Sequence, residues 1–227
     1  MNRSVRGKHA APYQPSKGPL IAGIALLAGF ILLSIALTAV DVQPIGPLDS
    51  RIGLASINGA VFAATGTSAL FDTLSDGLLV LSILTILGYG ILGIKQLIQR
   101  KSLSAVDRDL YLFAALCVVL LVLYIAFDAL ALNYRPILDD GELKPSFPSS
   151  HTLLIICIAA VSFIQAHNRI DNDTARKAVQ VLCIVIIGVA FVGRILSGAH
   201  WFTDVVGGLL LGLSLACLYH AACERLS

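Results

Sequence analysis

Charged residues are scarce in this chain of 227 residues. Asp, Glu, Lys and Arg make up only 13% of it, whereas hydrophobic residues make up 57% and the mean hydropathy is +0.85. A soluble globular domain has about a quarter charged residues and about half apolar ones. The scarcity excludes an ordinary soluble domain and indicates a chain that crosses a membrane several times. The net charge of +2 is too small to favour nucleic acid as a partner.

Cysteine motifs are also lacking. Four of the five cysteines lie inside apolar runs and Cys223 lies just after the last run, and none belongs to a CxxC or CxxxH pattern. We therefore expect buried thiols rather than disulfides or a metal site. No cleavable signal pattern is present, because the first apolar run is long enough to remain as a spanning helix.

Six apolar runs are each long enough to cross a hydrocarbon core of about 30 Å. The sequence therefore predicts an all-α fold, a polytopic membrane bundle of six transmembrane helices in one domain. Residues 1–18 form a basic tail expected to be flexible and cytoplasmic, residues 19–227 form the membrane domain, and a short interfacial helix is expected near 55–68. The six runs cover residues 19–40, 73–97, 109–132, 149–167, 177–197 and 201–221.

Lys and Arg are distributed unevenly between the segments that join these runs. If the N-terminus is cytoplasmic, twelve of the sixteen fall on the cytoplasmic side, as is usual for membrane proteins. The sequence thus predicts a multi-pass protein of the cell membrane with both termini in the cytoplasm. In this topology Arg135, His151, Arg194 and His200 all reach the outer face, although they are far apart in the sequence.

The fourth run begins with Pro148-Ser149-Ser150-His151. Ser149 and Ser150 are good residues for a helix start, where free backbone N–H groups and the helix dipole attract an anion. His151 beside such an anion can give a proton to a leaving oxygen.

The sixth run begins with His200 and Asp204, spaced so that both lie on one helix face. A carboxylate on one imidazole nitrogen leaves the other free to attack, and Arg194 and Arg135 suit phosphate oxygens. A single membrane histidine is more often structural, so the prediction depends on the whole set meeting at one face. The histidines could instead hold a divalent ion together with Asp204 and Asp139 or Asp140, but two arginines favour an anion.

These residues resemble the type 2 phosphatidic acid phosphatase (lipid phosphate phosphatase) superfamily over residues of about 70–220. The resemblance implies that His200 forms a phosphohistidine, that Asp204 orients it and that His151 protonates the leaving group. It also implies that Arg135, Arg194, Ser149 and Ser150 hold the phosphate, with no metal or other cofactor. The matching motifs are Arg135-Pro136, Pro148-Ser149-Ser150-His151 and Gly193-Arg194-Ile195-Leu196-Ser197-Gly198-Ala199-His200-Trp201-Phe202-Thr203-Asp204.

The sequence departs from the family pattern at three positions. Asp128 stands where the family has Lys, Ser150 where it has Gly, and Gly193 where it has Ser. The last two changes keep small residues near the phosphate. Lys144 could substitute for the missing cation, or Asp128 could pair with Arg135 or Lys144.

The resemblance implies a lipid phosphatase acting at the outer face on undecaprenyl diphosphate, phosphatidate or phosphatidylglycerophosphate. Its partners would then be a lipid phosphate or diphosphate substrate and membrane lipids. Two alternatives remain open at this point. One is a lipid phosphotransferase that uses the same histidine, and the other is a protein that binds or transports a lipid phosphate without catalysis. The sequence leaves the oligomeric state undetermined.

Overall fold

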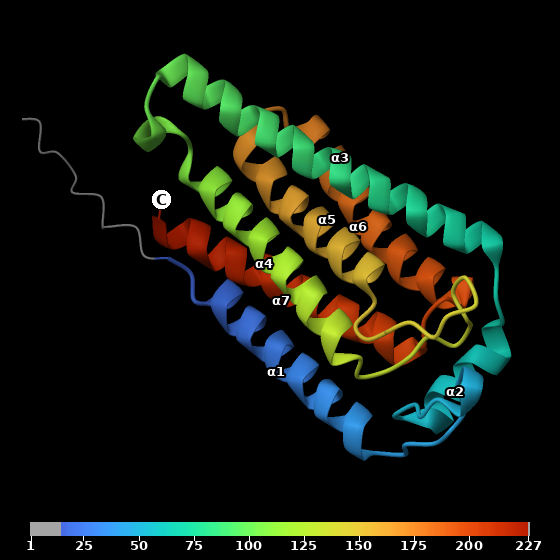
Figure 1. Cartoon of the computed structure of the whole chain (residues 1–227). Coiled ribbons are helices and arrows are strands. Elements are labelled where there is room, and N and C mark those ends of the chain that lie inside the picture. The colour runs from blue at the N-terminus through green and yellow to red at the C-terminus, as the bar shows by residue number, and fades with distance from the viewer. Residues whose placement is uncertain (1–14, 227) are drawn as a thin grey trace, which may run out of the picture.

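The computed structural model describes residues 15–226, so most of the tail predicted at residues 1–18 lies outside the described residues. This part of the chain is helical and contains no strand (Figure 1). The helices are α1 (Gly18–Ala39), α2 (Ala55–Thr65), α3 (Ala69–Arg100), α4 (Arg108–Leu130), α5 (Ser150–Arg169), α6 (Asp173–Ser197) and α7 (Phe202–Leu226), with short 3₁₀ turns η1 (Pro47–Asp49) and η2 (Leu103–Ala105).

The six predicted spanning helices are confirmed. Within residues 15–226, α1, α3, α4, α5, α6 and α7 are long and apolar enough to cross a membrane. The bounds differ most for α3, which has 32 residues and extends beyond the predicted run at both ends. The short helix α2 forms in the segment where an interfacial helix was predicted.

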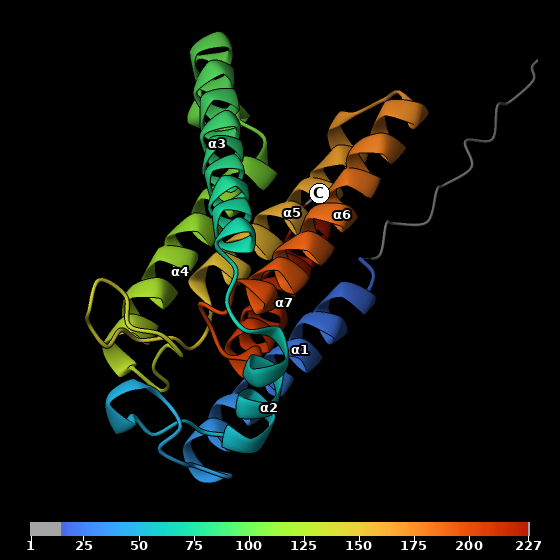
Figure 2. The same ribbon diagram turned by 90° about the vertical axis from the view of Figure 1, so that its right-hand side faces the viewer.

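Helices α5 and α7 lie at the centre of the bundle. Their most apolar stretches are 56% and 50% buried, against 6% in α3. Helix α7 packs against α1, α5 and α4, whereas α3 packs on the outside against α5 and α6 (Figure 2). A β-carbon on Gly208 of α7 would lie 2.9 Å from the carbonyl oxygen of Ser149. The absence of that side chain lets α7 approach the start of α5 closely.

The chain passes up and down through the bundle, so alternate helix ends meet at one end. The ends of α1, α4 and α6 lie there with the starts of α3, α5 and α7 and with α2 (Figure 1). Arg51, Arg135, Lys144 and Arg194 belong to this end. The other Lys and Arg residues in the described part of the chain belong to the opposite end, and those before residue 15 lie outside it. We call the end with the four cations the site end.

Helix α2 is fixed to the start of α7 by the fully buried Asn58. The Asn58 Nδ2 group donates to the Thr203 hydroxyl at 2.9 Å, and the Thr203 N–H donates to Asn58 Oδ1 at 3.1 Å. Because both hydrogen bonds are shielded from water, they hold the 41–68 segment against the site end.

The structure describes all five cysteines and joins none of them by a disulfide bond. Cys157 and Cys183 are buried within α5 and α6. These two and the buried Cys223 contribute small apolar side chains to the packing, as the sequence predicts. Cys117 and Cys217 are only partly buried, so the prediction holds for three of the five.

Candidate active site

His200 lies in the short turn that joins α6 to α7 and is only 4% exposed. Helix α6 ends at Ser197 and is capped by Gly198, whose φ of +68° lies in the left-handed region. A β-carbon on Gly198 would collide with the carbonyl oxygen of Gly66. Glycine therefore allows the sharp turn that directs His200 into the bundle.

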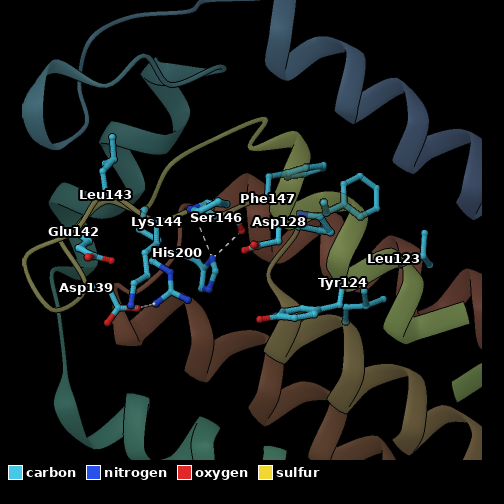
Figure 3. Close-up of a pocket in the computed structure, with 16 residues that line it drawn as sticks. Leu123, Tyr124, Asp128, Asp139, Glu142, Leu143, Lys144, Ser146, Phe147 and His200 are labelled. Atoms are coloured by element: carbon cyan, nitrogen blue, oxygen red, sulfur yellow. Dashed lines mark hydrogen bonds and ion pairs between the residues drawn. The ribbon is translucent and has the colours of Figure 1, made fainter. Parts of the chain in front are cut away.

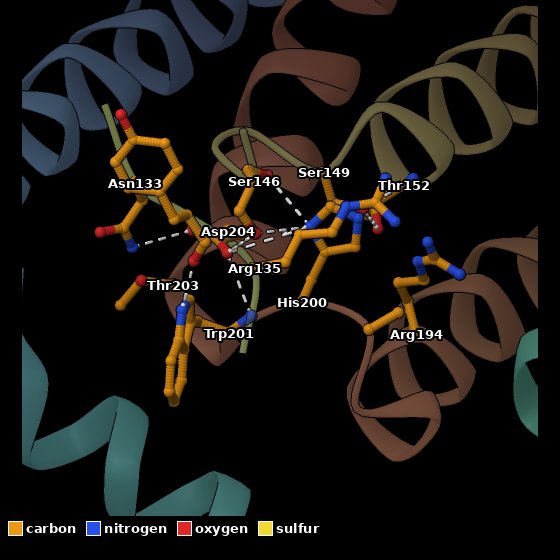
Figure 4. A network of polar contacts seen from close by, with 12 residues as sticks. Asn133, Arg135, Ser146, Ser149, Thr152, Arg194, His200, Trp201, Thr203 and Asp204 are labelled. Atoms are coloured by element: carbon orange, nitrogen blue, oxygen red, sulfur yellow. Dashed lines mark hydrogen bonds and ion pairs between the residues drawn. The ribbon is translucent and has the colours of Figure 1, made fainter. Parts of the chain in front are cut away.

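The hydrogen bonding of His200 determines which ring nitrogen is free. Its Nδ1 atom lies 3.0 Å from the carbonyl oxygen of Ser146. Since a carbonyl oxygen can only accept, Nδ1 carries the hydrogen. The Nε2 atom is buried and has no hydrogen-bond partner among the described residues. A neutral ring with its hydrogen on Nδ1 has an unshared electron pair on Nε2. Figure 4 shows His200 together with Ser146 and Asp204.

Asp204 does not contact His200 in the way that the sequence suggested. We expected its carboxylate to bond the ring directly, but Oδ2 lies 3.9 Å from His200 Nδ1. The hydroxyl of Ser146 lies between them: it donates to Asp204 Oδ2 and is 3.0 Å from His200 Nδ1. The influence of Asp204 on the ring therefore passes through Ser146.

The fully buried Asp204 also ties three segments together. Its carboxylate accepts the backbone N–H of Trp201 at 3.0 Å and the Asn133 side chain at 3.3 Å. Its backbone oxygen accepts the N–H of Ser149 at 3.0 Å. The start of α7, the loop after α4 and the start of α5 are thereby held around His200 (Figure 4).

The surroundings of His200 favour its neutral form. Burial lowers the pKa of His200 well below its usual value of 6.5, and the positive charges of Arg194, Arg135 and His151 lower it further. The hydrogen bond to the Ser146 carbonyl raises it and offsets only part of the effect. A neutral imidazole is the form that can act as a nucleophile or a base.

Two guanidinium groups reach this site from different elements. Arg194 of α6 is 3% exposed in its side chain and donates to Asp72 Oδ1 at 2.6 Å. Arg135, in the loop after α4, donates to Asp139 Oδ2 at 2.8 Å, and Lys144 lies 3.5 Å from the same carboxylate oxygen. Each guanidinium keeps its Nε atom buried and without an acceptor among the described residues.

The N-terminus of α5 is capped by a serine side chain and has free backbone N–H groups. Ser149 is the N-cap, and its hydroxyl accepts the backbone N–H of Thr152 at 3.5 Å and the Thr152 hydroxyl at 3.0 Å. Pro148 precedes the cap and therefore lies outside the helix. The backbone N–H groups of Ser150 and His151 have no acceptor among the described residues, which leaves them available to an anion.

His151 stands in the first turn of α5. Its Nε2 atom lies 3.1 Å from Asp76 Oδ1 on α3, while its Nδ1 atom is buried without a partner among the described residues. The sequence had drawn attention to His151 but not to Asp76.

A polar cavity of about 530 Å³ opens at this site. Arg135, Lys144, Ser150 and His200 line it, and so does Asp128 (Figure 3). The alternative in which Asp128 pairs with Arg135 or Lys144 is wrong for this structure, because both cations pair with Asp139. The carboxyl group of Asp128 instead faces the cavity and makes its mouth less positive.

An apolar cavity of about 390 Å³ adjoins the polar one. It lies between α3, α4 and α5, and His151 is part of its wall. Tyr124, Ser150 and Leu153 line both cavities. The site therefore joins a cationic mouth to an apolar groove, an arrangement that fits a molecule with an anionic head and a hydrocarbon tail.

Few buried side-chain atoms lack a hydrogen-bond partner in the described part of the chain, and four of those six are nitrogens of the predicted site residues. Such atoms are rare in folded proteins and often mark function. The four are Arg135 Nε, His151 Nδ1, Arg194 Nε and His200 Nε2. Oxygen atoms of a phosphate group would supply acceptors for the guanidinium groups.

Several residues of the site were not predicted from the sequence. Ser146, Asn133, Thr152, Asp72 and Asp76 all contact residues of the motifs. Three of them are uncharged, and the two carboxylates belong to a helix that carries none of the motifs. Among residues 15–226, no group of three or more His, Cys, Asp or Glu side chains is arranged to hold a metal ion.

The fold and the site define a class: an α-helical membrane protein with a cationic, histidine-containing site at one end of the bundle. Comparison with known families agrees, because the PAP2 superfamily model matches residues 112–226, just over half of the chain. This chain belongs to the PAP2 superfamily, and the resemblance seen in the sequence is confirmed at that level.

Two curated proteins are similar to parts of the chain. Phosphatidylglycerophosphatase B of Bacillus subtilis (strain 168) is 26% identical over 95 residues, which cover 41% of this chain and 46% of that protein. Lipid phosphate phosphatase delta of Arabidopsis thaliana is 25% identical over 91 residues, which cover 39% of this chain and 22% of that protein. The matched segment thus spans less than half the length of either relative.

The crystal structure of a transmembrane PAP2-type phosphatidylglycerolphosphate phosphatase from Bacillus subtilis has the same fold. The match has a TM-score of 0.60 at 21% sequence identity and covers 91% of this chain and 98% of that chain. At this level of identity the match supports the arrangement of the helices and leaves the substrate to be inferred from the site.

Proposed function

We propose that this protein is a membrane-embedded, metal-independent lipid phosphatase that works through a phosphohistidine at His200. The observation that carries the proposal is the set of four buried nitrogens without acceptors, from Arg135, His151, Arg194 and His200. Arg135 and His200 line the polar cavity, and His151 lines the apolar cavity that adjoins it. Membership of the PAP2 superfamily and similarity to two named phosphatases agree with this chemistry.

In the first step, His200 Nε2 attacks phosphorus and the bond from phosphorus to the lipid oxygen breaks. His151 gives its Nδ1 proton to that oxygen, so the lipid leaves as an alcohol, or as a monophosphate if the substrate was a diphosphate. Arg135, Arg194 and the N–H groups at the start of α5 stabilise the charge on the phosphoryl oxygens. The carbonyl of Ser146 holds the ring, and Asp204 supports it through the Ser146 hydroxyl.

In the second step, a water molecule attacks the phosphohistidine. His151, now neutral, accepts one proton from the water, the phosphorus–nitrogen bond breaks and inorganic phosphate leaves. Both side chains return to their starting states, so the reaction is balanced as lipid phosphate plus water giving lipid alcohol plus phosphate. The fixed tautomer of His200 serves both steps, because Nε2 is nucleophile in one and leaving group in the other.

The substrate in this proposal is a phosphomonoester or diphosphate of a lipid with one or more long apolar chains. The polar cavity receives the phosphate and the groove beside His151 receives the start of the tail. Undecaprenyl diphosphate, phosphatidate and phosphatidylglycerophosphate all fit this description. The placement of most Lys and Arg away from the site end favours an extracytoplasmic site with cytoplasmic termini.

Phosphate release by the purified protein in detergent tests the proposal. The assay uses EDTA and a panel of undecaprenyl diphosphate, phosphatidate and phosphatidylglycerophosphate, with the variant His200→Ala as control. We expect EDTA-resistant release that the variant loses. Release that persists in His200→Ala would contradict the mechanism, and transfer of phosphate to an added lipid alcohol in place of water would indicate a phosphotransferase.

A further inference from the structure

Helix α3 supplies two carboxylates to the site. It lies before residue 112, where the match to the family model begins. Asp72 and Asp76 are four residues apart, so they lie on one face of α3. Asp72 contacts Arg194 at 2.6 Å, and Asp76 contacts His151 at 3.1 Å. One helix thus holds both a phosphate-binding cation and the predicted proton donor.

The contact between Asp76 and His151 determines how the His151 ring is turned. An ionised carboxylate can only accept a hydrogen bond, so His151 Nε2 carries a hydrogen toward Asp76 Oδ1. The other nitrogen, Nδ1, is buried and has no partner among the described residues. Nδ1 is therefore the atom that can meet a leaving oxygen.

Among the charged groups of residues 15–226 that act most strongly on His151, Asp76 is the one carboxylate. The others are the guanidinium groups of Arg194 from α6 and Arg135 from the loop after α4, and His200 lies close on the far side of the site. When Nδ1 also carries a proton the ring is positively charged, and those two arginines oppose the charge. Asp76 supplies the opposite charge that the ring then needs.

We propose that Asp76 is a positioning residue for the general acid: it holds His151 by Nε2–H so that Nδ1 gives its proton to the leaving oxygen. This inference rests on the proposed function. As the phosphorus–oxygen bond breaks, the Nδ1 proton moves to the lipid oxygen, and the ring becomes neutral with its hydrogen still directed at Asp76. In the second step the proton from water returns to Nδ1. Asp76 touches neither the phosphate nor the lipid.

The leaving group provides a test, because a general acid matters most when the departing oxygen is basic. An alkyl phosphate such as phosphatidate needs the proton, whereas 4-nitrophenyl phosphate, whose leaving group is a weak base, needs it far less. Loss of Asp76 should therefore lower kcat/KM for phosphatidate more than kcat/KM for 4-nitrophenyl phosphate. Loss of Asp72 should lower kcat/KM for both substrates by the same factor. Asp72 holds Arg194, and in the proposed mechanism Arg194 binds phosphate oxygens rather than the leaving group.

The experiment compares kcat/KM for both substrates in wild type, Asp76→Asn, Asp76→Glu and Asp72→Asn. Asp173→Asn serves as the matched control, since Asp173 also pairs with an arginine but lies at the opposite end of the bundle. We expect Asp76→Asn to lower kcat/KM for phosphatidate by about 10- to 100-fold and to affect 4-nitrophenyl phosphate several times less. Asp76→Glu should recover part of the loss. Equal factors for the two substrates in Asp76→Asn would overturn the inference.

A second measurement tests the inference without catalysis, by determining the tautomer of His151 with NMR. In ¹⁵N-histidine-labelled protein, assigned with His151→Gln, the neutral His151 ring of the wild type should carry its hydrogen on Nε2. In Asp76→Asn this preference should weaken to a mixture of tautomers. An unchanged tautomer would overturn the role of Asp76. Absence of activity in the wild type would instead contradict the proposed function, so the two failures are distinguishable.

Discussion

The carbonyl oxygen of Ser146 lies 3.0 Å from Nδ1 of His200, although the two residues are 54 positions apart. This contact fixes which ring nitrogen carries the hydrogen and leaves Nε2 with its electron pair. A backbone carbonyl thus performs the orienting task that a carboxylate performs in many catalytic triads. The carboxylate of Asp204 does not bond the ring itself. It accepts a hydrogen bond from the Ser146 hydroxyl, which lies beside the ring.

Replacing Ser146 with Ala tests this arrangement, because the carbonyl remains while the hydroxyl is lost. The buried Asp204 would lose one of its hydrogen bonds, at a cost of about 1–3 kcal/mol in the free energy of unfolding. We expect kcat to fall by about tenfold or more, since a loss of about 1.4 kcal/mol in the transition state corresponds to a factor of ten. Steady-state kinetics and a thermal melt in detergent measure both effects. A kcat equal to that of the wild type would mean that Asp204 does not act through Ser146.

The acid–base behaviour of His200 gives a prediction about pH. Because folding lowers the pKa of His200 well below 6.5, the folded protein keeps this ring neutral at a pH where the unfolded chain is already protonated. The unfolded state then binds more protons, so the contribution of His200 to stability is fully present above about pH 6.5 and falls as the pH falls. An NMR titration in detergent, assigned with His200→Ala, should give a midpoint below 6.5. A midpoint at or above that value would contradict the neutral nucleophile.

The close packing of α7 against α5 predicts the effect of a small change. In Gly208→Ala the new β-carbon would lie 2.9 Å from the Ser149 carbonyl oxygen and 3.0 Å from the Leu153 backbone nitrogen. We expect a loss of about 1–3 kcal/mol in the free energy of unfolding and reduced activity, because the start of α5 must move. Gly188→Ala on α6 is the matched control, since its β-carbon would meet no atom of another described helix or loop within 4 Å. Equal stability of the two variants would contradict this account of the packing.

Asp128 gives a prediction about substrate affinity. Its carboxylate lines the cationic cavity without pairing with Arg135 or Lys144, so it should repel an anionic head group. Asp128→Asn should lower KM by about two- to fivefold with little change in kcat. The gain should shrink at high salt, because exposed charges are screened. Asp171→Asn, at the opposite end, should leave KM unchanged. A higher KM in Asp128→Asn would indicate that the carboxylate helps to bind the substrate.

Much of the fold followed from the sequence because membrane-spanning helices depend on local composition. The apolar runs located all six helices, and the strict alternation of direction brought Arg135, His151, Arg194 and His200 to one end. The family pattern was equally local, since its residues are close together within each motif.

The partners of those residues were not predictable in this way. Ser146 is an ordinary loop serine in the sequence, and only the packing of the loop against the start of α7 places it beside His200. Asp76 is 75 positions from His151, on a helix without motifs. The prediction about Asp204 was wrong for the same reason. The spacing of His200 and Asp204 predicts a shared face, but it does not reveal that Ser146, which is distant in the sequence, lies between their side chains.

The measurement that tests the central claim most directly is a search for the phosphoenzyme. The purified protein would be mixed with ³²P-labelled phosphatidate in EDTA, quenched within milliseconds in alkali and digested for mass spectrometry. The account predicts a phosphoryl group, stable in alkali and lost in acid, on the peptide that contains His200, and none in His200→Ala. Turnover without a labelled histidine in the wild type, or a label that persists in His200→Ala, would contradict it.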